Sequence, residues 1–171
     1  MIQVRPATQD DSQEWLRMRQ ALWPEYASRW HAQEIEQFFA GKLAMPLAVL
    51  IAHDDSGTPL GFAELSIRNY AEDCVTDRVA YLEGWYVVPE ARLRGVGRAL
   101  VSAAERWGLG QGCTEFGSDA LIENTTSAAA HRALGFEETA QIRCFRKQLT
   151  PNSIGIRAAA QPVQRPGRQE P

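Results

Sequence analysis

Hydrophobic and polar positions along this chain follow two periods, which together predict a mixture of strands and helices. Alternating or continuous apolar positions typical of strands occur in six segments: residues 2–5, 47–52, 60–67, 79–88, 114–118 and 140–149. Apolar positions at helical spacing predict four helices: from the polar residues 11–14 to near Pro24, over 31–44, from 96 to near 108–110, and over 126–134. This order predicts an α+β fold, a mixed α/β sandwich with helices on both faces of a mixed sheet.

Short polar motifs mark the ends of several predicted elements. Asp11-Ser12-Gln13-Glu14 has the pattern of a capping box and predicts the start of the first helix. Asp54-Asp55-Ser56-Gly57 lies between two apolar runs, so these runs are expected to pair as an antiparallel hairpin. Gly135 is expected to end the last helix.

The chain of 171 residues is long enough for one domain with a substantial core. Residues 150–171 differ from the rest, because they contain four prolines, two glycines and few large apolar side chains. We therefore expect a folded domain over residues 1–149 and a flexible C-terminal tail over 150–171 that takes no part in catalysis.

Charge and cysteine content narrow the classes of function. A net charge of −3 and a pI near 5.7 argue against nucleic-acid binding and suit a cationic substrate. The three cysteines are widely spaced, so no metal site or disulfide framework is expected. The chain shows neither a signal-peptide pattern nor an apolar run of about 18 residues, which predicts a cytoplasmic protein without a membrane partner.

The segment 87–100 carries the most specific chemical signal in the chain. A predicted strand runs through a short basic loop containing Gly95 and Gly97 into an amphipathic helix. Glycines allow backbone N–H groups to approach an anion, and the helix N-terminus adds unpaired donors and a positive dipole end. The loop lacks the spacing of nucleotide triphosphatases and of dinucleotide-binding folds, but three arginines surround it: Arg92, Arg94 and Arg98.

This loop resembles the signature of the GNAT N-acetyltransferase superfamily, Gln/Arg-x-x-Gly-x-Gly/Ala, in its segment Arg92-Leu93-Arg94-Gly95-Val96-Gly97. The stretch from Asn124 to Ala133-Leu134-Gly135-Phe136 resembles a second superfamily segment. The resemblance implies a mostly antiparallel mixed sheet and acetyl-coenzyme A bound at the loop by its pyrophosphate.

Further pieces between Met1 and Leu149 are similar to the smaller, dimeric subgroup of aminoglycoside 6′-N-acetyltransferases. They are Leu22-Trp23, Ser66-Ile67-Arg68 with Tyr70, Leu82-Glu83-Gly84, Ser118-Asp119, Glu123-Asn124, and His131 with the segment 133–139. The similarity implies acetyl transfer to the 6′-amine of an aminoglycoside by direct attack in a ternary complex, antibiotic resistance, and a homodimer.

The resemblance also implies roles for individual residues. Binding of acetyl-coenzyme A would fall to the backbone of Tyr86, Val87 and Val88, the loop Arg92, Leu93, Arg94, Gly95, Val96, Gly97 and Arg98, and the side chains of Asn124 and His131. Glu83 and Asp119 would grip the cationic substrate and accept its proton, and His131 would act as general acid. Trp23 and Tyr70 would offer aromatic faces to the sugar and its ammonium groups.

Several of these residues also have a purely structural interpretation. Glu83 could be a solvated acid at a strand end, Asp119 could cap a helix or a turn, and Asn124 could cap the helix that follows it. Trp23 could belong to the core, and His131 could be a packed or surface residue. Ala140 and Phe145 depart from the subgroup, which often has an acid and a tyrosine there.

Two other functions therefore stay open. One is a GNAT enzyme that acetylates a different amine, such as a polyamine, an amino acid or a protein N-terminus. The other is a non-catalytic module that binds acyl-coenzyme A.

Overall fold

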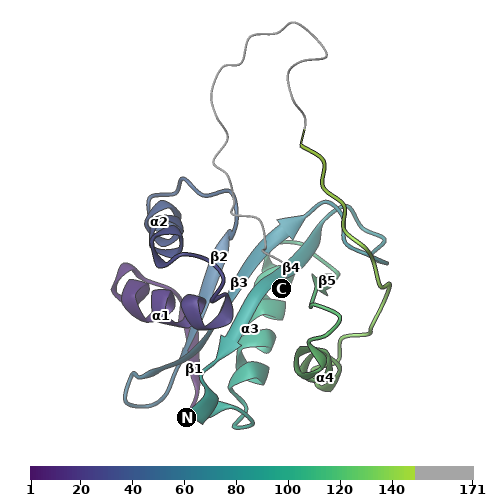
Figure 1. Ribbon diagram of the computed structural model, residues 1–171. Helices are drawn as coiled ribbons and strands as arrows, with labels where there is room; N and C mark the ends of the chain where they lie inside the picture. Colours follow the sequence, from purple (N-terminus) through teal and green to yellow (C-terminus); the bar gives the residue numbers. More distant parts are fainter. Residues whose placement is uncertain (149–171) are drawn as a thin grey trace, which may run out of the picture. The chain divides into compact units, whose positions relative to one another are not determined.

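A five-stranded sheet forms the centre of the computed structural model (Figure 1). Its strands lie in the order of the chain: β1 (Gln3–Pro6), β2 (Ala48–His53), β3 (Pro59–Arg68), β4 (Val79–Val87) and β5 (Phe116–Ser118). The first four pair antiparallel, whereas β5 runs parallel to β4. The predicted mixed, mostly antiparallel sheet is confirmed.

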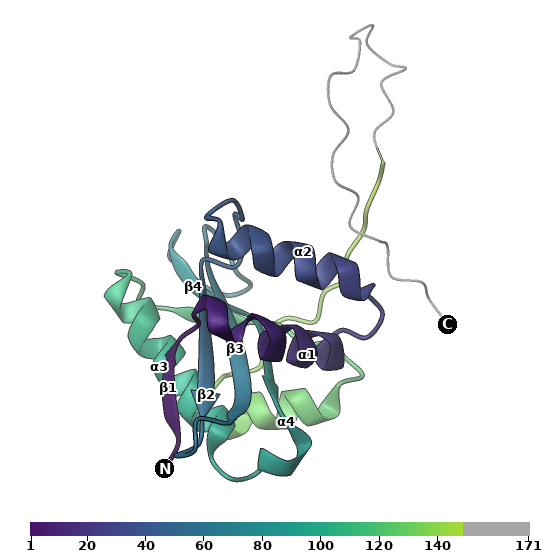
Figure 2. The ribbon, with the colours of Figure 1, turned by 90° about the vertical axis from the view of Figure 1, so that its left-hand side faces the viewer.

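Helices cover both faces of this sheet. Helices α1 (Ser12–Leu22) and α2 (Ser28–Phe39) lie on one face, and α3 (Val96–Gly110) and α4 (Thr125–Ala133) lie on the other (Figures 1 and 2). Two short 3-10 turns, η1 (Gln9–Asp11) and η2 (Pro89–Ala91), precede α1 and α3. The arrangement confirms the α+β class.

The core lies on both sides of the central strands. Five large side chains from α1, β2, β3, β4 and α3 are completely or almost completely buried: Trp15, Ile51, Phe62, Leu82 and Leu100. Strand β2 is buried on both faces and has the continuous apolar run expected of such a strand, whereas β3 also buries the polar side chains of Glu64 and Ser66. The hairpin that joins them turns where predicted, at Asp54, whose carboxylate accepts from the N–H groups of Ser56 and Thr58.

Two helix boundaries differ from the prediction. Helix α2 begins at Ser28 instead of 31 and ends at Phe39 instead of 44, because Gly41 follows with a left-handed φ of 67° and its N–H donates to the carbonyl of Phe38. The predicted capping box of α1 is also wrong. Asp11 makes no cap hydrogen bond to that helix; its carboxylate accepts instead from Arg5 and from the backbone and hydroxyl of Thr8.

The last predicted strand is absent as well. The structure describes residues 1–148, of which Met1–Ala140 form one compact unit, and it assigns no strand to residues 140–148. A strand forms only where its backbone pairs with another strand, and no such pairing is found for this segment among the described residues. The predicted tail over 150–171 lies outside the described residues. Within the described part of the chain, no helix is both long and apolar enough to cross a membrane.

Asp11 provides a test of the fold through pH. Burial alone would raise the pKa of this 6% exposed carboxyl, but hydrogen bonds from Arg5 and Thr8 outweigh burial and hold the pKa well below its usual range. Its contribution to stability is therefore complete above the pKa of the unfolded chain, near 4, and is lost as the pH falls below that value. We expect Asp11→Asn to lower the free energy of unfolding at pH 7 by about 2 kcal/mol. The variant should also lose less of this free energy than the wild type as the pH falls from 7 to 3.

Urea unfolding between pH 3 and 7 measures this effect. The matched control is Asp10→Asn at the exposed neighbouring position. An equal loss of stability in both variants would contradict the role assigned to Asp11.

Candidate functional site

The loop between β4 and α3 presents unpaired backbone donors. Gly95 is the N-cap of α3 with a left-handed φ of 86°, and no side chain caps this end of the helix. The first hydrogen bond of the helix reaches from the N–H of Ala99 to the carbonyl of Gly95. The N–H groups of residues 96–98 therefore stay available at the positive end of the helix dipole, the arrangement that binds phosphate groups.

The arginines of this loop fasten it to its surroundings. Their side chains are solvent-accessible, and each donates to a backbone carbonyl: Arg92 Nε to Val87 at 3.1 Å, Arg94 Nη1 to Glu90 at 3.4 Å, and Arg98 Nη2 to Ala133 at 3.3 Å. Leu93 also adopts a positive φ of 59°, and its side chain is fully exposed. The predicted residues 92–98 thus form one cationic loop around the start of α3.

The second half of strand β4 has, in the described part of the chain, no partner strand on the side where β5 pairs with its first half, and we call this side the free edge. Strand β5 pairs only with Ala80, Tyr81 and Leu82, so beyond Leu82 this side of β4 is unpaired among the described residues. The N–H of Val88 donates to Leu60 of β3 at 3.0 Å. In an antiparallel ladder the backbone groups of successive residues point alternately toward and away from the partner strand, so the N–H and carbonyl of Val87 point away from β3. The Val87 carbonyl accordingly accepts from Arg92. Of the three predicted backbone donors, Val87 is the one that faces the free edge.

Glu83 lies in a bulge at the start of this free edge. Gly84 is opposite Glu64 on β3, but Leu82 is opposite Leu65, so Glu83 is an extra residue in β4. A bulge of this kind bends the strand and redirects the side chain. The residues around Glu83 are therefore placed by the register of β3 and β4.

The Glu83 carboxylate is held by two side chains of β3. It accepts from the Ser66 hydroxyl and from Arg68, whose Nε and Nη2 lie 2.9 and 2.6 Å from its two oxygens. Such a bidentate pair fixes the orientation of both groups. Burial alone would lower the pKa of Arg68, but the hydrogen bond and charge of Glu83 raise it above its usual value.

The same arginine connects Glu83 to Asp119. Its guanidinium carbon lies 3.4 Å from the centre of the Tyr81 ring, and the Tyr81 hydroxyl donates to Asp119 Oδ2 at 3.1 Å. Burial and the negative charge of Asp119 raise the pKa of Tyr81, so the phenol stays neutral as a donor. The two predicted acids are thus brought into one network, which we call the acid network: Ser66, Arg68, Tyr81, Glu83 and Asp119.

Trp23 lies beside this network and belongs to the core as well. A Cβ placed on Gly84 would come within 2.5 Å of two carbons of the Trp23 ring, so the indole lies directly on the strand next to Glu83. On the core side, the Arg19 guanidinium lies 5.3 Å from the Trp23 ring centre. The core interpretation of Trp23 therefore holds, and its contact with the substrate stays a prediction.

Arg19 is part of a buried ionic cluster under Trp23. It is 4% exposed and forms ion pairs with Glu34 at 2.8 Å and with Glu64 at 2.9 Å. Burial raises the pKa of Glu64 to about 7, although the charge of Arg19 and a hydrogen bond from Trp15 lower it. The Nε of Arg19 approaches Glu64 without hydrogen-bond geometry, so this contact is mainly electrostatic.

His131 of α4 lies where β4 and β5 separate. Its Nδ1 is 2.8 Å from the carbonyl of Ser127, which can only accept, so Nδ1 carries the proton when the ring is neutral. Its Nε2 then faces the Ser118 hydroxyl at 2.9 Å, and that hydroxyl also lies 3.3 Å from the carbonyl of Leu82. The structure thus adds Ser118 as the side chain that joins His131 to Leu82, the last residue of β4 that pairs with β5.

Two predicted residues make no hydrogen bond to the acid network or to His131 among the described residues. The side chain of Tyr70 is 65% exposed in the loop that follows β3. Asn124 is the N-cap of α4 and accepts from the N–H of Ser127 at 3.0 Å, which confirms its structural interpretation. Their contacts with substrate and cofactor stay predictions.

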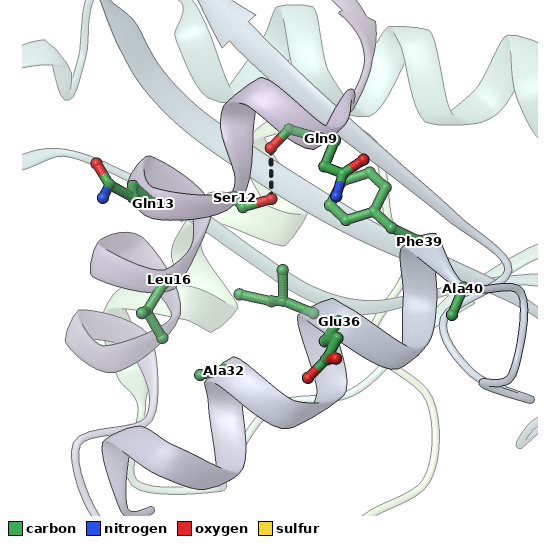
Figure 3. A pocket seen from close by; sticks show the side chains of 9 residues that line it. Gln9, Ser12, Gln13, Leu16, Ala32, Glu36, Phe39 and Ala40 are labelled. Atoms are coloured by element: carbon green, nitrogen blue, oxygen red, sulfur yellow. Dashed lines mark hydrogen bonds between the residues drawn. The ribbon is translucent and has the colours of Figure 1, made fainter.

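A separate hollow of about 400 Å³ lies between α1 and α2 (Figure 3). Leu16, Ala32 and Phe39 provide apolar lining, and the Ser12 hydroxyl donates to the Gln9 carbonyl at its rim. None of the predicted site residues lines it. Among the described residues there is also no group of three or more His, Cys, Asp or Glu side chains able to hold a metal ion.

Four residues were missed in the sequence: Ser66, Arg68 and Tyr81 of the acid network, and Ser118 beside His131. Ser66 and Arg68 are two positions apart on a strand and so share a face, which was a usable signal. Their pairing with Glu83 depends on the bulge, which no local pattern in the sequence marks.

The family model and the relatives that match this chain all describe acetyltransferases. The model of the acetyltransferase (GNAT) family matches residues 15–136. Aminoglycoside N(6′)-acetyltransferase type 1 of Klebsiella aerogenes is 58% identical over 146 residues, covering 85% of this chain and 96% of the relative. The enzyme of the same name from Salmonella enteritidis is 38% identical, covering 86% of this chain and 99% of the relative.

Solved structures agree with the sequence relatives. The structure of AAC(6′)-Iy in complex with the bisubstrate analog CoA-S-monomethyl-acetylneamine has a TM-score of 0.80 at 37% identity, covering 87% of this chain and 99% of that one. Aminoglycoside antibiotic 6′-N-acetyltransferase AAC(6′)-Ih from Acinetobacter baumannii has a TM-score of 0.79 at 35% identity, covering 88% and 100%.

The contact between Trp23 and Gly84 can be tested directly. We expect Gly84→Ala to displace the indole and to lower the free energy of unfolding by about 1–3 kcal/mol. Thermal unfolding measures the stability, and tryptophan emission reports the displaced ring. The control is Gly110→Ala, where an added Cβ meets nothing within 4 Å. If both variants unfold and fluoresce alike, Trp23 does not depend on the close approach at Gly84.

Proposed function

This chain belongs to the GNAT family of acetyltransferases, and we propose that it transfers the acetyl group of acetyl-coenzyme A to the 6′-amine of aminoglycosides and so confers resistance to them. The observation that carries the proposal is the placement of two sites around one strand. An uncapped, arginine-rich helix start follows β4, and a network with two carboxylates lies at its bulge. The first suits a diphosphate and the second suits a polycationic amine.

The residues present fit acetyl-coenzyme A. The N–H groups of residues 96–98 would bind the pyrophosphate, and Arg92, Arg94 and Arg98 would add positive charge around it. The cofactor supplies an acyl group already activated as a thioester. The Val87 N–H, on the free edge of β4, is the donor that would stabilise negative charge on the acyl oxygen.

Proton transfer would involve the groups that lie where β4 and β5 separate: the two carboxylates and His131. The amine must be neutral to attack, so its proton must pass to Asp119 or Glu83, directly or through water. The departing thiolate needs a proton in return. His131 would supply it through Ser118 from its doubly protonated form: the proton on Nε2 passes to the Ser118 hydroxyl, whose own proton passes to the thiolate, and the ring is left neutral with its proton on Nδ1.

Three further properties complete the proposal. We expect the protein to act in the cytoplasm, to form a homodimer, and to bind neither nucleic acid nor membranes. Light scattering after size exclusion tests the dimer. The net charge of −3 supports the absence of a nucleic-acid partner.

A substrate screen tests the activity itself. We expect purified protein with acetyl-coenzyme A to acetylate kanamycin and tobramycin far faster than spermidine, with release of free coenzyme A as the measurement. Turnover of spermidine alone would favour the alternative GNAT acting on another amine. Tight coenzyme A binding without turnover of any amine would favour the non-catalytic module.

The two carboxylates can be tested separately from the cofactor loop. We expect Glu83→Gln and Asp119→Asn each to lower kcat/KM for kanamycin by about 10- to 100-fold, because an ammonium loses its counter-charge. The affinity for coenzyme A, measured by calorimetry, should stay within about twofold, since the loop at 92–98 is unchanged.

The matched control is Glu105→Gln on the exposed side of α3, which removes the same charge elsewhere. If coenzyme A affinity falls together with kcat/KM in the Glu83 and Asp119 variants, the separation of the two sites is refuted.

A further inference from the structure

One member of the acid network carries the same charge as the substrate. Arg68 lies between the two carboxylates: it pairs with Glu83 on one side and covers the ring of Tyr81, the donor to Asp119, on the other. An ammonium group of the substrate would seek the same partners. The site as folded therefore already contains one cation.

The pair leaves Glu83 little spare capacity for another donor. One of its oxygens accepts from both Ser66 and Arg68, and the other accepts from Arg68 at 2.6 Å. Asp119, in contrast, receives the Tyr81 hydroxyl on one oxygen, and its side chain is exposed. A substrate ammonium would meet an accessible carboxylate at Asp119 and an internally neutralised one at Glu83.

The Arg68–Glu83 pair is placed where it can exchange partners. The Arg68 side chain is 32% exposed and that of Glu83 is 17% exposed, so the pair is partly screened by water. Such pairs are weak compared with fully buried ones. A second cation brought close by a bound ligand can replace the guanidinium at Glu83 without leaving a buried charge unpaired.

Building on the proposed function, we propose that Arg68 is a specificity-determining residue: an internal counter-cation that holds the place of a substrate ammonium at Glu83. A ligand with one positive charge gains little there, because it only exchanges one cation for another. A ligand with several charges can contact Asp119 first and then compete for Glu83. Arg68 thus selects polycationic amines over simple ones.

The variant Arg68→Met tests this selection, because it removes the charge and keeps much of the side-chain volume. With the charge removed, the site has two net negative charges instead of one. We expect the Kd of 6-amino-6-deoxyglucose, a sugar with a single amine, to fall about 10-fold and that of kanamycin to fall less, so the preference for kanamycin shrinks. The dependence of both Kd values on salt should become steeper. Calorimetry at two salt concentrations, with coenzyme A present, measures all four values.

Three further variants separate charge from positioning. Arg17→Met, on the exposed side of α1, makes the same charge change away from the site and should leave the preference unchanged. Arg68→Lys keeps the charge and should keep the preference. Ser66→Ala removes a hydrogen bond to Glu83 without changing charge and should also keep the preference, which provides a test even where Arg68→Met fails to fold.

The opposite results are equally clear. Weaker binding of both ligands in Arg68→Met, as expected for Glu83→Gln, would show that Arg68 only holds Glu83 in place and would overturn the inference. Loss of the preference in Ser66→Ala would do the same. If wild-type protein binds coenzyme A but neither binds nor acetylates kanamycin, the proposed function fails first, and this result is distinct from both.

Discussion

The separation of β5 from β4 after Leu82 is the constraint on which the rest of the site depends. Three paired residues hold β5 in the sheet, and beyond them β4 continues with one edge unpaired among the described residues. That edge carries the Val87 amide, the bulge at Glu83 and, at its end, the loop that opens α3. Backbone N–H and carbonyl groups that would pair with a neighbouring strand are thereby available to hydrogen-bond a ligand. The buried ladder of β2, β3 and β4 holds these groups in place.

Charged groups on the two sides of this strand are balanced in different ways. Toward the core, Arg19 is enclosed by aromatic rings and paired with Glu34 and Glu64, so its charge is almost removed from solvent. In the acid network, Arg68 pairs with Glu83 while water still reaches both side chains. The first arrangement is costly to disturb and fixes structure, whereas the second can exchange partners.

The sequence predicted what depends on local residue types. The glycine loop, the hairpin at Asp54 and the strands of the sheet follow from patterns a few residues long, and the structure confirms them. What could not be predicted depends on contacts distant in sequence. Asp11 bonds backward to Arg5 instead of capping α1, and the partner of Glu83 is set by a register shift between two strands. The strand predicted at 140–149 had the right pattern, but residues 140–148 have no pairing partner among the described residues.

The contact of Trp23 with Gly84 has an evolutionary consequence. One indole packs both against the hydrophobic core and against β4 beside Glu83 of the acid network, so a replacement that changes the surface next to Glu83 also loosens the core. Substitutions of Trp23 must therefore be accompanied by compensating substitutions elsewhere in the core. The loop that carries Tyr70 has no comparable role in the core, because this side chain is 65% exposed, so substitutions there leave the interior intact.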